Sequence, residues 1–208
     1  MMSEFSYIPK SKEQSFQNNS GIFTPKDIYD LTKADKYTNY GQLELIETKI
    51  FSGDNIVDFT DLKTNLYDVH FSTISVTLSS SSSINIRFIK GGVVDSSSNY
   101  QYAYQNGTAT GTFGESVHTS NNTMFATRTG GTNEPRIATN YFYNLGDSNK
   151  YSFMTMNAVS ETSGTTACDM RFGGGLIDVT SAIDGIRYFD TGGALLTGSI
   201  SLYGLRYS

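Results

Sequence analysis

The chain has no tryptophan and a single cysteine, Cys168, among its 208 residues. One cysteine cannot form an intrachain disulfide, and it cannot build a thiolate metal site by itself. We therefore expect packing, hydrogen bonding or assembly to hold the fold together.

Charge is also scarce, since Lys, Arg, Asp and Glu make up 17% of the residues, against about 25% in an average globular protein. Ser, Thr, Asn, Gly and Tyr occupy the polar positions instead, a composition that favours strands and turns over helices. The net charge of -5 and the lack of any Lys/Arg run argue against a protein that neutralises a phosphate backbone. No nucleic-acid partner is expected.

Long apolar runs are missing as well. The first residues, MMSEFSYIPKSKEQSFQ, contain no apolar core of a signal peptide, and no window approaches 18 apolar residues. The sequence predicts synthesis in a cytoplasm and no membrane partner.

Short strands dominate what is present. Apolar residues alternate with polar ones at Tyr67, Val69 and Phe71, and the alternation then shifts by one residue to a second set starting at Ile74. This shift predicts a β-bulge near Ser72–Thr73 or a strand that passes from one sheet to another. Eight or more such strands, separated by Gly, Asn, Asp and Ser, predict an all-β fold, a jelly-roll-like antiparallel β-sandwich over residues 46–208.

Residues 1–45 are predicted to form an extended attachment arm with one short helix at about 25–34. Thr24 suits the N-cap, Pro25 the first helical position, and Asp27 the third position of a capping box. A helix this short is marginal alone, so we expect it to dock on a partner. The candidate anchoring residues are Phe23, Ile28, Tyr29 and Leu31.

Tyr100, Tyr102 and Tyr104 project to one face of a predicted strand. Core packing is the leading interpretation, and a subunit interface or a face that stacks on sugar rings are the alternatives. Residues 106–136, rich in Gly, Thr and Asn, are expected to form long surface loops with one short strand, where variable contacts concentrate.

Catalytic and metal-binding patterns are weak. His70 and His118 are too few and too far apart to argue a metal site, and His70 occupies the polar phase of its strand, which favours a surface or interface position. No GxSxG motif supports nucleophilic catalysis. Gly173–Gly175 lacks the Lys-Ser/Thr of a phosphate loop and is expected to be a tight connection or bulge.

Acidic residues offer no better pattern. Glu44 with Glu47, or Glu115 with Glu134, could be read as glycosidase carboxylates, but solvated acids are the favoured interpretation. Asp54, Asp58 and Asp61 could bind Ca²⁺, but they lack the spacing of an EF-hand loop, and turn formation explains them as well. We expect no cofactor, no metal and no enzymatic activity.

The stretch Asp178–Ser208 resembles the closing hairpin of a jelly-roll domain that recurs in structural proteins of tailed bacteriophages. That family has a segment of the form aITSIRF, a Gly-containing turn and a last strand reading GSxIxLYGL. The corresponding residues here are Thr180–Tyr188, Gly192–Gly193 and Gly198–Leu205. This chain departs from the pattern by inserting Ala182 and Asp184. Near the other end, Gly21–Thr24 with Tyr29 and Leu31 is similar to the segment GxFTxxxxYxL of phage virion proteins.

The resemblance implies a structural component of a bacteriophage virion, located in the virion as a capsid decoration or appendage, or as a tail or baseplate protein. It further implies attachment to other virion proteins through the N-terminal arm and self-association of the β-domain as a homo-oligomer, a trimer by analogy. The alternative is a receptor-binding or glycan-binding tip of a phage tail fibre, with a host surface glycan as its partner. A glycan-degrading enzyme is the third reading.

Overall fold

A computed structural model describes residues 24–34, 43–161 and 167–205. The chain divides into two units, residues 1–40 and 41–208, and each is described here by itself. Strand β1 begins at Leu43, three residues before the predicted start of the β-domain. The predicted arm before Thr24 lies outside the described residues.

Helix α1 (Pro25–Lys33) begins as the sequence predicts. The Asp27 N–H donates to Thr24 Oγ1 at 3.2 Å, and the Thr24 N–H donates to Asp27 Oδ2 at 2.8 Å. Both halves of the capping box are therefore present, with Pro25 at the first helical position, and the predicted cap is confirmed.

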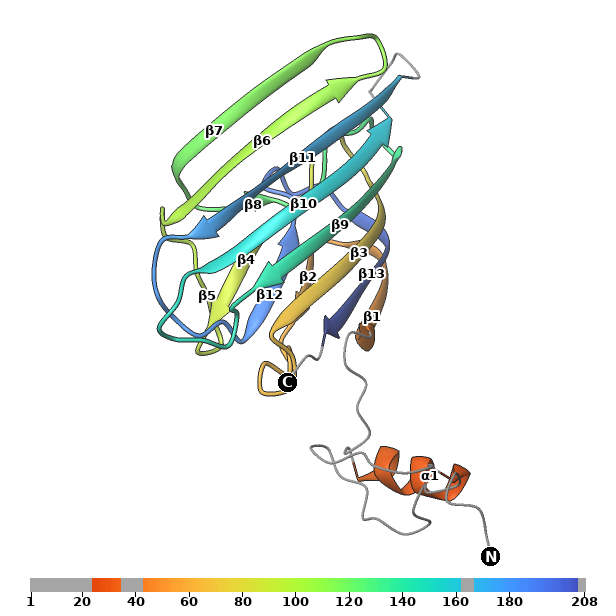
Figure 1. Ribbon diagram of the computed structural model, residues 1–208. Helices are drawn as coiled ribbons and strands as arrows, with labels where there is room; N and C mark the ends of the chain where they lie inside the picture. Colours follow the sequence, from red (N-terminus) through yellow and green to blue (C-terminus); the bar gives the residue numbers. More distant parts are fainter. Residues whose placement is uncertain (1–23, 35–42, 162–166, 206–208) are drawn as a thin grey trace, which may run out of the picture. The chain divides into compact units, whose positions relative to one another are not determined.

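The β-domain consists of two antiparallel sheets packed face to face, with the larger sheet in front in Figure 1. We call them the large sheet and the small sheet. The large sheet contains, in spatial order, β1 (Leu43–Asp54), β13 (Leu196–Leu205), β3 (Val69–Leu78), β9 (Pro135–Tyr143), β10 (Ser152–Glu161), β11 (Cys168–Ile177), β6 (Tyr100–Thr108) and β7 (Phe113–Asn121).

The small sheet lies behind the large one. Its central strand pairs, β12 with β2 and β12 with β4, run in unbroken antiparallel register. Its strands are β2 (Ile56–Phe59), β12 (Gly185–Phe189), β4 (Asn85–Lys90) and β5 (Val93–Val94), and β8 (Met124–Phe125) also pairs with β4.

Eight of these strands have the connectivity of a jelly roll. Taken in chain order as β1, β2, β3, β4, β8, β9, β12 and β13, they lie as 1-8-3-6 in the large sheet and 2-7-4-5 in the small sheet. The predicted jelly-roll-like sandwich is thus confirmed.

Two hairpins extend this jelly roll on the large sheet only. The pair β6–β7 is inserted between β4 and β8, and the pair β10–β11 is inserted between β9 and β12. Both extend the large sheet beyond β9, which makes that sheet much wider than its partner. A nine-residue strand, β7, therefore occupies the region where long loops were expected.

The core lies between the sheets. Phe88 of β4 packs against Tyr100 and Phe142 of the large sheet, with ring centroids 6.1 and 6.3 Å apart. Its other fully buried members include Phe59, Ile74, Leu78, Ile84, Ile86, Met124, Tyr188, Leu196, Ile200 and Leu202.

The β-bulge predicted near Ser72–Thr73 is absent from strand β3. It pairs with β13 and β9 without any register shift from Val69 to Thr77. Ile74 faces the core, whereas Phe71 faces outward and is only half-buried. The apparent shift arose because both faces of the strand carry apolar residues, and not because the backbone changes phase.

Gly173–Gly175 also differs from expectation, because it lies inside β11 and not in a connection. A Cβ at Gly173 would lie 2.3 Å from the Ala103 carbonyl oxygen, and one at Gly175 would lie 2.5 Å from that of Gln101. Tyr104 and Tyr102 stand directly opposite these two glycines. The glycines let their neighbours approach more closely than any side chain permits.

Candidate interaction surfaces

The outward face of the large sheet carries an aromatic cluster. Phe71 of β3 lies between Tyr141 of β9 and Tyr203 of β13, with ring centroids 4.6 and 6.0 Å away. Tyr143 stacks beside Tyr141 at 6.4 Å. The strands bring these rings together because directly paired residues on one face of an antiparallel sheet are cross-strand neighbours.

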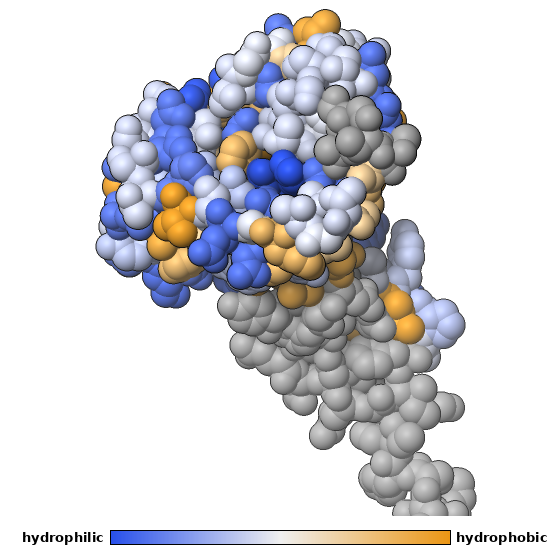
Figure 2. Space-filling view, turned by 90° about the horizontal axis from the view of Figure 1, so that it is seen from above, coloured by the Kyte–Doolittle hydropathy of each residue, from blue (hydrophilic) through white to orange (hydrophobic). Residues whose placement is uncertain are grey.

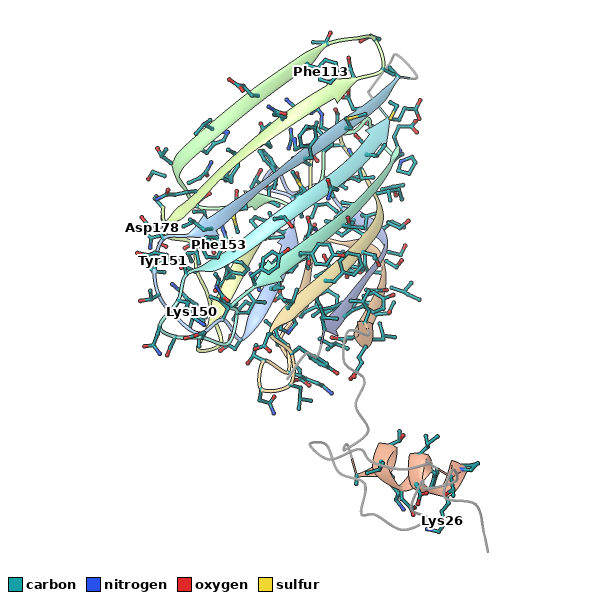
Figure 3. All side chains as sticks on the ribbon, viewed as in Figure 1. Lys26, Phe113, Lys150, Tyr151, Phe153 and Asp178 are labelled. Atoms are coloured by element: carbon teal, nitrogen blue, oxygen red, sulfur yellow. The ribbon has the colours of Figure 1, made fainter. Side chains whose placement is uncertain are left out.

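A second apolar group lies on the same face, across β9, β10 and β11. Ile137, Val159 and Met170 are directly paired across these strands and are 50%, 48% and 43% exposed. Phe172, on the next outward position of β11, is 43% exposed. Figure 3 labels Phe153 and Phe113, two further exposed rings on β10 and β7.

Between the two apolar groups the outward residues are mostly hydroxyl-bearing. Lys, Arg and Asp are absent from the outward positions of the six inner strands, and Glu161, the last residue of β10, is the single carboxylate among them. We call the outward side of these six strands, β13, β3, β9, β10, β11 and β6, the neutral face. Its hydroxyl-bearing members are Thr73, Ser75, Thr77, Thr139, Thr155, Thr197, Ser199 and Ser201.

The outward face of the small sheet is charged instead. Asp58, Arg187 and Arg87 stand side by side on β2, β12 and β4. Arg187 donates from Nε and Nη2 to the two carboxylate oxygens of Asp58 at 2.8 and 2.6 Å, and this pairing raises the pKa of the guanidinium. Arg87 lies over the Phe189 ring at 4.8 Å.

The three predicted tyrosines point inward. Tyr100 is fully buried and Tyr102 is 7% exposed, while Tyr104 is half-buried. The Tyr100 hydroxyl donates to the Asp95 carbonyl at 3.0 Å and accepts from the Phe88 N–H at 2.9 Å. Burial raises the pKa of Tyr102 to about 12. Core packing describes Tyr100 and Tyr102, and neither ring presents a face to a sugar or a second subunit.

Tyr104 instead holds a buried cation. The Arg171 guanidinium lies between the rings of Tyr104 and Phe125, 4.1 and 4.5 Å from their centroids. Its Nε donates to Asn106 Oδ1 at 3.1 Å, and burial lowers its pKa to about 10. This stack fills the inner side of β6 and β11, where the large sheet has been widened by the inserted hairpins.

In the helix, Leu31 is buried, whereas Ile28 is 38% and Tyr29 is 65% exposed. Phe23, the remaining candidate for anchoring, lies outside the described residues. Tyr29 is thus the most accessible of the described anchoring candidates.

Two polar side chains are buried against expectation: Arg136 was not singled out from the sequence, and His70 was predicted at a surface or an interface. Arg136 is fully buried and donates to five backbone carbonyls, at distances from 2.8 to 3.2 Å. His70 is also fully buried, not at the surface as predicted, and its Nε2 donates to the Leu62 carbonyl at 2.6 Å. When both faces of a strand carry apolar residues, as in β3, the alternation does not tell whether a polar residue faces the core or the outside. The carbonyls that hold Arg136 belong to Ser80, Ser82, Gly130, Gly131 and Glu134.

The carboxylates proposed from the sequence have local partners. Glu44 accepts the Tyr67 hydroxyl at 2.7 Å, and Glu47 pairs with Lys49 at 3.5 Å. The structure brings Glu134 beside Glu161, where a hydrogen bond between them raises the pKa of Glu161. A directly hydrogen-bonded pair is closer than the roughly 5 Å or more that separates glycosidase carboxylates.

Two open hollows lie elsewhere on the domain. The larger, about 540 Å³, is lined by Asn55, Ile56, Arg87, Asn122, Phe189, Asp190, Thr191 and Gly193. The smaller, about 260 Å³, lies beside Phe113 and Glu115. Seen from above, the domain shows hydrophilic and hydrophobic residues in small separate groups (Figure 2).

Within the described ranges, no group of three or more His, Cys, Asp or Glu side chains is arranged to hold a metal ion. In the same part of the chain no helix is both long and apolar enough to cross a membrane. Comparison with protein-family models, with curated proteins and with solved structures found no match.

Proposed function

We propose that this chain is a structural component of a bacteriophage virion, a capsid decoration or appendage or a tail or baseplate protein. Its β-domain serves as the body that assembles, and its N-terminal segment attaches it to other virion proteins. The observation that carries the proposal is the neutral face: a wide sheet surface whose exposed apolar residues and near absence of charge fit a protein partner.

A solvated sheet face normally presents charged and polar residues to water. Here exposed Ile137, Val159, Met170 and Phe172 join with the Phe71–Tyr141–Tyr203 cluster on one surface almost free of charge. Aromatic enrichment and depletion of charge are the features of the central part of protein interfaces. A surface of this kind supports assembly better than catalysis.

The residues behind the phage resemblance support the proposal from a second direction. The last C-terminal segment of the resemblance, Gly198–Leu205, lies in β13, between β1 and β3 in the large sheet. Gly198 adopts φ +142, and a Cβ there would lie 2.2 Å from the Ser75 carbonyl oxygen; at Gly204 it would lie 2.1 Å from the Tyr67 ring. Both glycines of the GSISLYGL strand are thus required by packing, and the strand's outward side chains belong to the neutral face.

Attachment is assigned to the N-terminal segment because α1 starts at a fixed place and exposes Tyr29 beside the partly exposed Ile28. Short capped helices of this kind gain their stability from docking. We propose assembly as a trimer, and attachment to other virion proteins, on the resemblance of the sequence to phage structural proteins.

Host-glycan binding is the second candidate function. The buried tyrosines do not favour it, but the hollow of about 540 Å³ does, because most of its lining residues are polar: Asn55, Arg87, Asn122, Asp190 and Thr191. Binding of the isolated protein to a glycan array, lost on Arg87→Ala, would favour this candidate over a purely structural role.

The test of the structural role is a phage that encodes the chain without residues 1–37. We expect electron microscopy and mass spectrometry of purified particles to show loss of the protein from virions that otherwise contain it. A chain absent from particles even at full length would contradict the virion assignment. Normal incorporation of the shortened chain would contradict attachment through the N-terminal segment.

A further inference from the structure

We propose that the neutral face is the surface through which copies of this chain bind each other. The inference rests on the proposed function, since it names the partner of the same surface. It assigns the contact to the outward side of β13, β3, β9, β10 and β11, with the aromatic cluster and the Ile137–Val159–Met170 group as its two apolar anchors.

Charge favours a second copy over a different partner. The chain carries a net charge of -5, so two copies repel wherever their acidic surfaces meet. The neutral face adds little to this repulsion, because Glu161 at its end is the single acid at the outward positions of the six inner strands. Unlike partners usually select each other through complementary charges, and this face offers none.

The hydroxyl residues fit the same conclusion. A Ser or Thr hydroxyl both donates and accepts hydrogen bonds, so a row of them is complementary to itself. Thr73, Thr139 and Ser201 lie side by side on β3, β9 and β13, between the two apolar groups. Such a row can satisfy its hydrogen bonds against an identical row, whereas a row of acids or bases cannot.

The size of the surface is sufficient. The five strands of the proposed contact, spaced about 4.8 Å apart and each of about ten residues rising about 3.3 Å, offer an outward area on the order of 800 Å². A stable interface buries about 800 Å² on each partner. The face is therefore large enough for a complete subunit contact, and Tyr, Phe and Met are residue types enriched in such contacts.

The experiment measures the mass of the full chain by sedimentation velocity and light scattering, from low micromolar concentration upward. We expect a mass of at least twice the 22.8 kDa of one chain. Ile137→Lys and, separately, Met170→Lys should each raise the dissociation constant at least tenfold, because each places a cation in the contact. Both positions are about half exposed in the single chain, so circular dichroism should report an unchanged fold.

The matched control is Val93→Lys, which adds the same charge at an exposed apolar residue of the small sheet and should leave the mass unchanged. A monomeric wild-type chain overturns the proposal, as does equal weakening by Val93→Lys and Ile137→Lys. If the chain is monomeric in solution but enters virions, the neutral face binds another virion protein: the structural role then stands and this inference falls.

Discussion

The two outward faces of the sandwich differ in kind although they enclose one core. The small sheet presents Asp58, Arg187 and Arg87 in one row, with a bidentate ion pair between the first two. The large sheet presents Phe71, Tyr141 and Ile137, and almost no charge. Folding requires only the inner faces to be apolar, so the outer apolar residues of the large sheet are not needed for the core, and this is the basis of the contact proposed above. The charged face shows what the same chain places against water.

The largest expected effect comes from removing the arginine that supports the large sheet from inside. Arg136→Gln leaves the carbonyls of Gly130 and Gly131 buried without donors and removes the hydrogen bonds to three part-buried carbonyls. Each buried carbonyl left unsatisfied costs about 1–3 kcal/mol. We expect a loss of about 3–5 kcal/mol in the free energy of unfolding, measured by urea denaturation. A loss below about 1 kcal/mol would contradict the role assigned to Arg136, which is to satisfy these five backbone carbonyls.

A somewhat smaller effect is expected at the glycines that bring β10, β11 and β6 together. Gly173→Ala places a Cβ against the Ala103 carbonyl oxygen and Tyr104 Cα, and overpacking of this kind costs about 1–3 kcal/mol. The matched control is Gly114→Ala on β7, where a Cβ meets only Asn106 Nδ2 at 3.7 Å. Equal melting temperatures for the two variants would contradict the close approach of β6 to β11 at Gly173.

A smaller, pH-dependent effect is expected from His70, which lies on the inner side of β3 beneath the neutral face. Burial lowers the pKa of its imidazole, so the unfolded chain binds the proton more readily than the folded chain. The contribution of His70 to stability is complete above the unfolded pKa of about 6.5 and is lost as the pH falls below it. The melting temperature should fall between pH 7.5 and pH 5.5, and His70→Gln should flatten this slope. An equal slope in both proteins would rule out His70 as the cause.

The smallest effect is expected on the charged face. Asp58→Asn removes the ion pair with Arg187, whose side chains are 28% and 27% exposed, and partly exposed pairs contribute about 0–1 kcal/mol. Urea denaturation should show a loss below about 1 kcal/mol, with the oligomeric mass unchanged. A change in the oligomeric mass would show that the charged face also takes part in the contact between copies, which would contradict the difference proposed between the two faces.

Much of the fold was predictable from local patterns. The capping box at Thr24–Asp27, the succession of short strands and the jelly-roll class follow from residue types that act within a few positions of each other. The bulge in β3, the surface position of His70 and the turn at Gly173–Gly175 were predicted wrongly. The first two errors came from assuming that one face of a strand is apolar and the other polar, which fails where both faces carry apolar residues. The third came from interpreting consecutive glycines as a connection or bulge, whereas inside β11 they make room for β6.

The sequence by itself determined the class of the protein: strands and turns from a charge-poor, hydroxyl-rich composition, and one helix from its cap. The tertiary structure alone decided which apolar residues form the core and which form the neutral face. The physical reason is that alternation assigns side chains to two faces without saying which faces the other sheet. Only the pairing of strands distant in sequence placed Phe71, Tyr141 and Tyr203 together outside, and Tyr100 and Tyr102 inside.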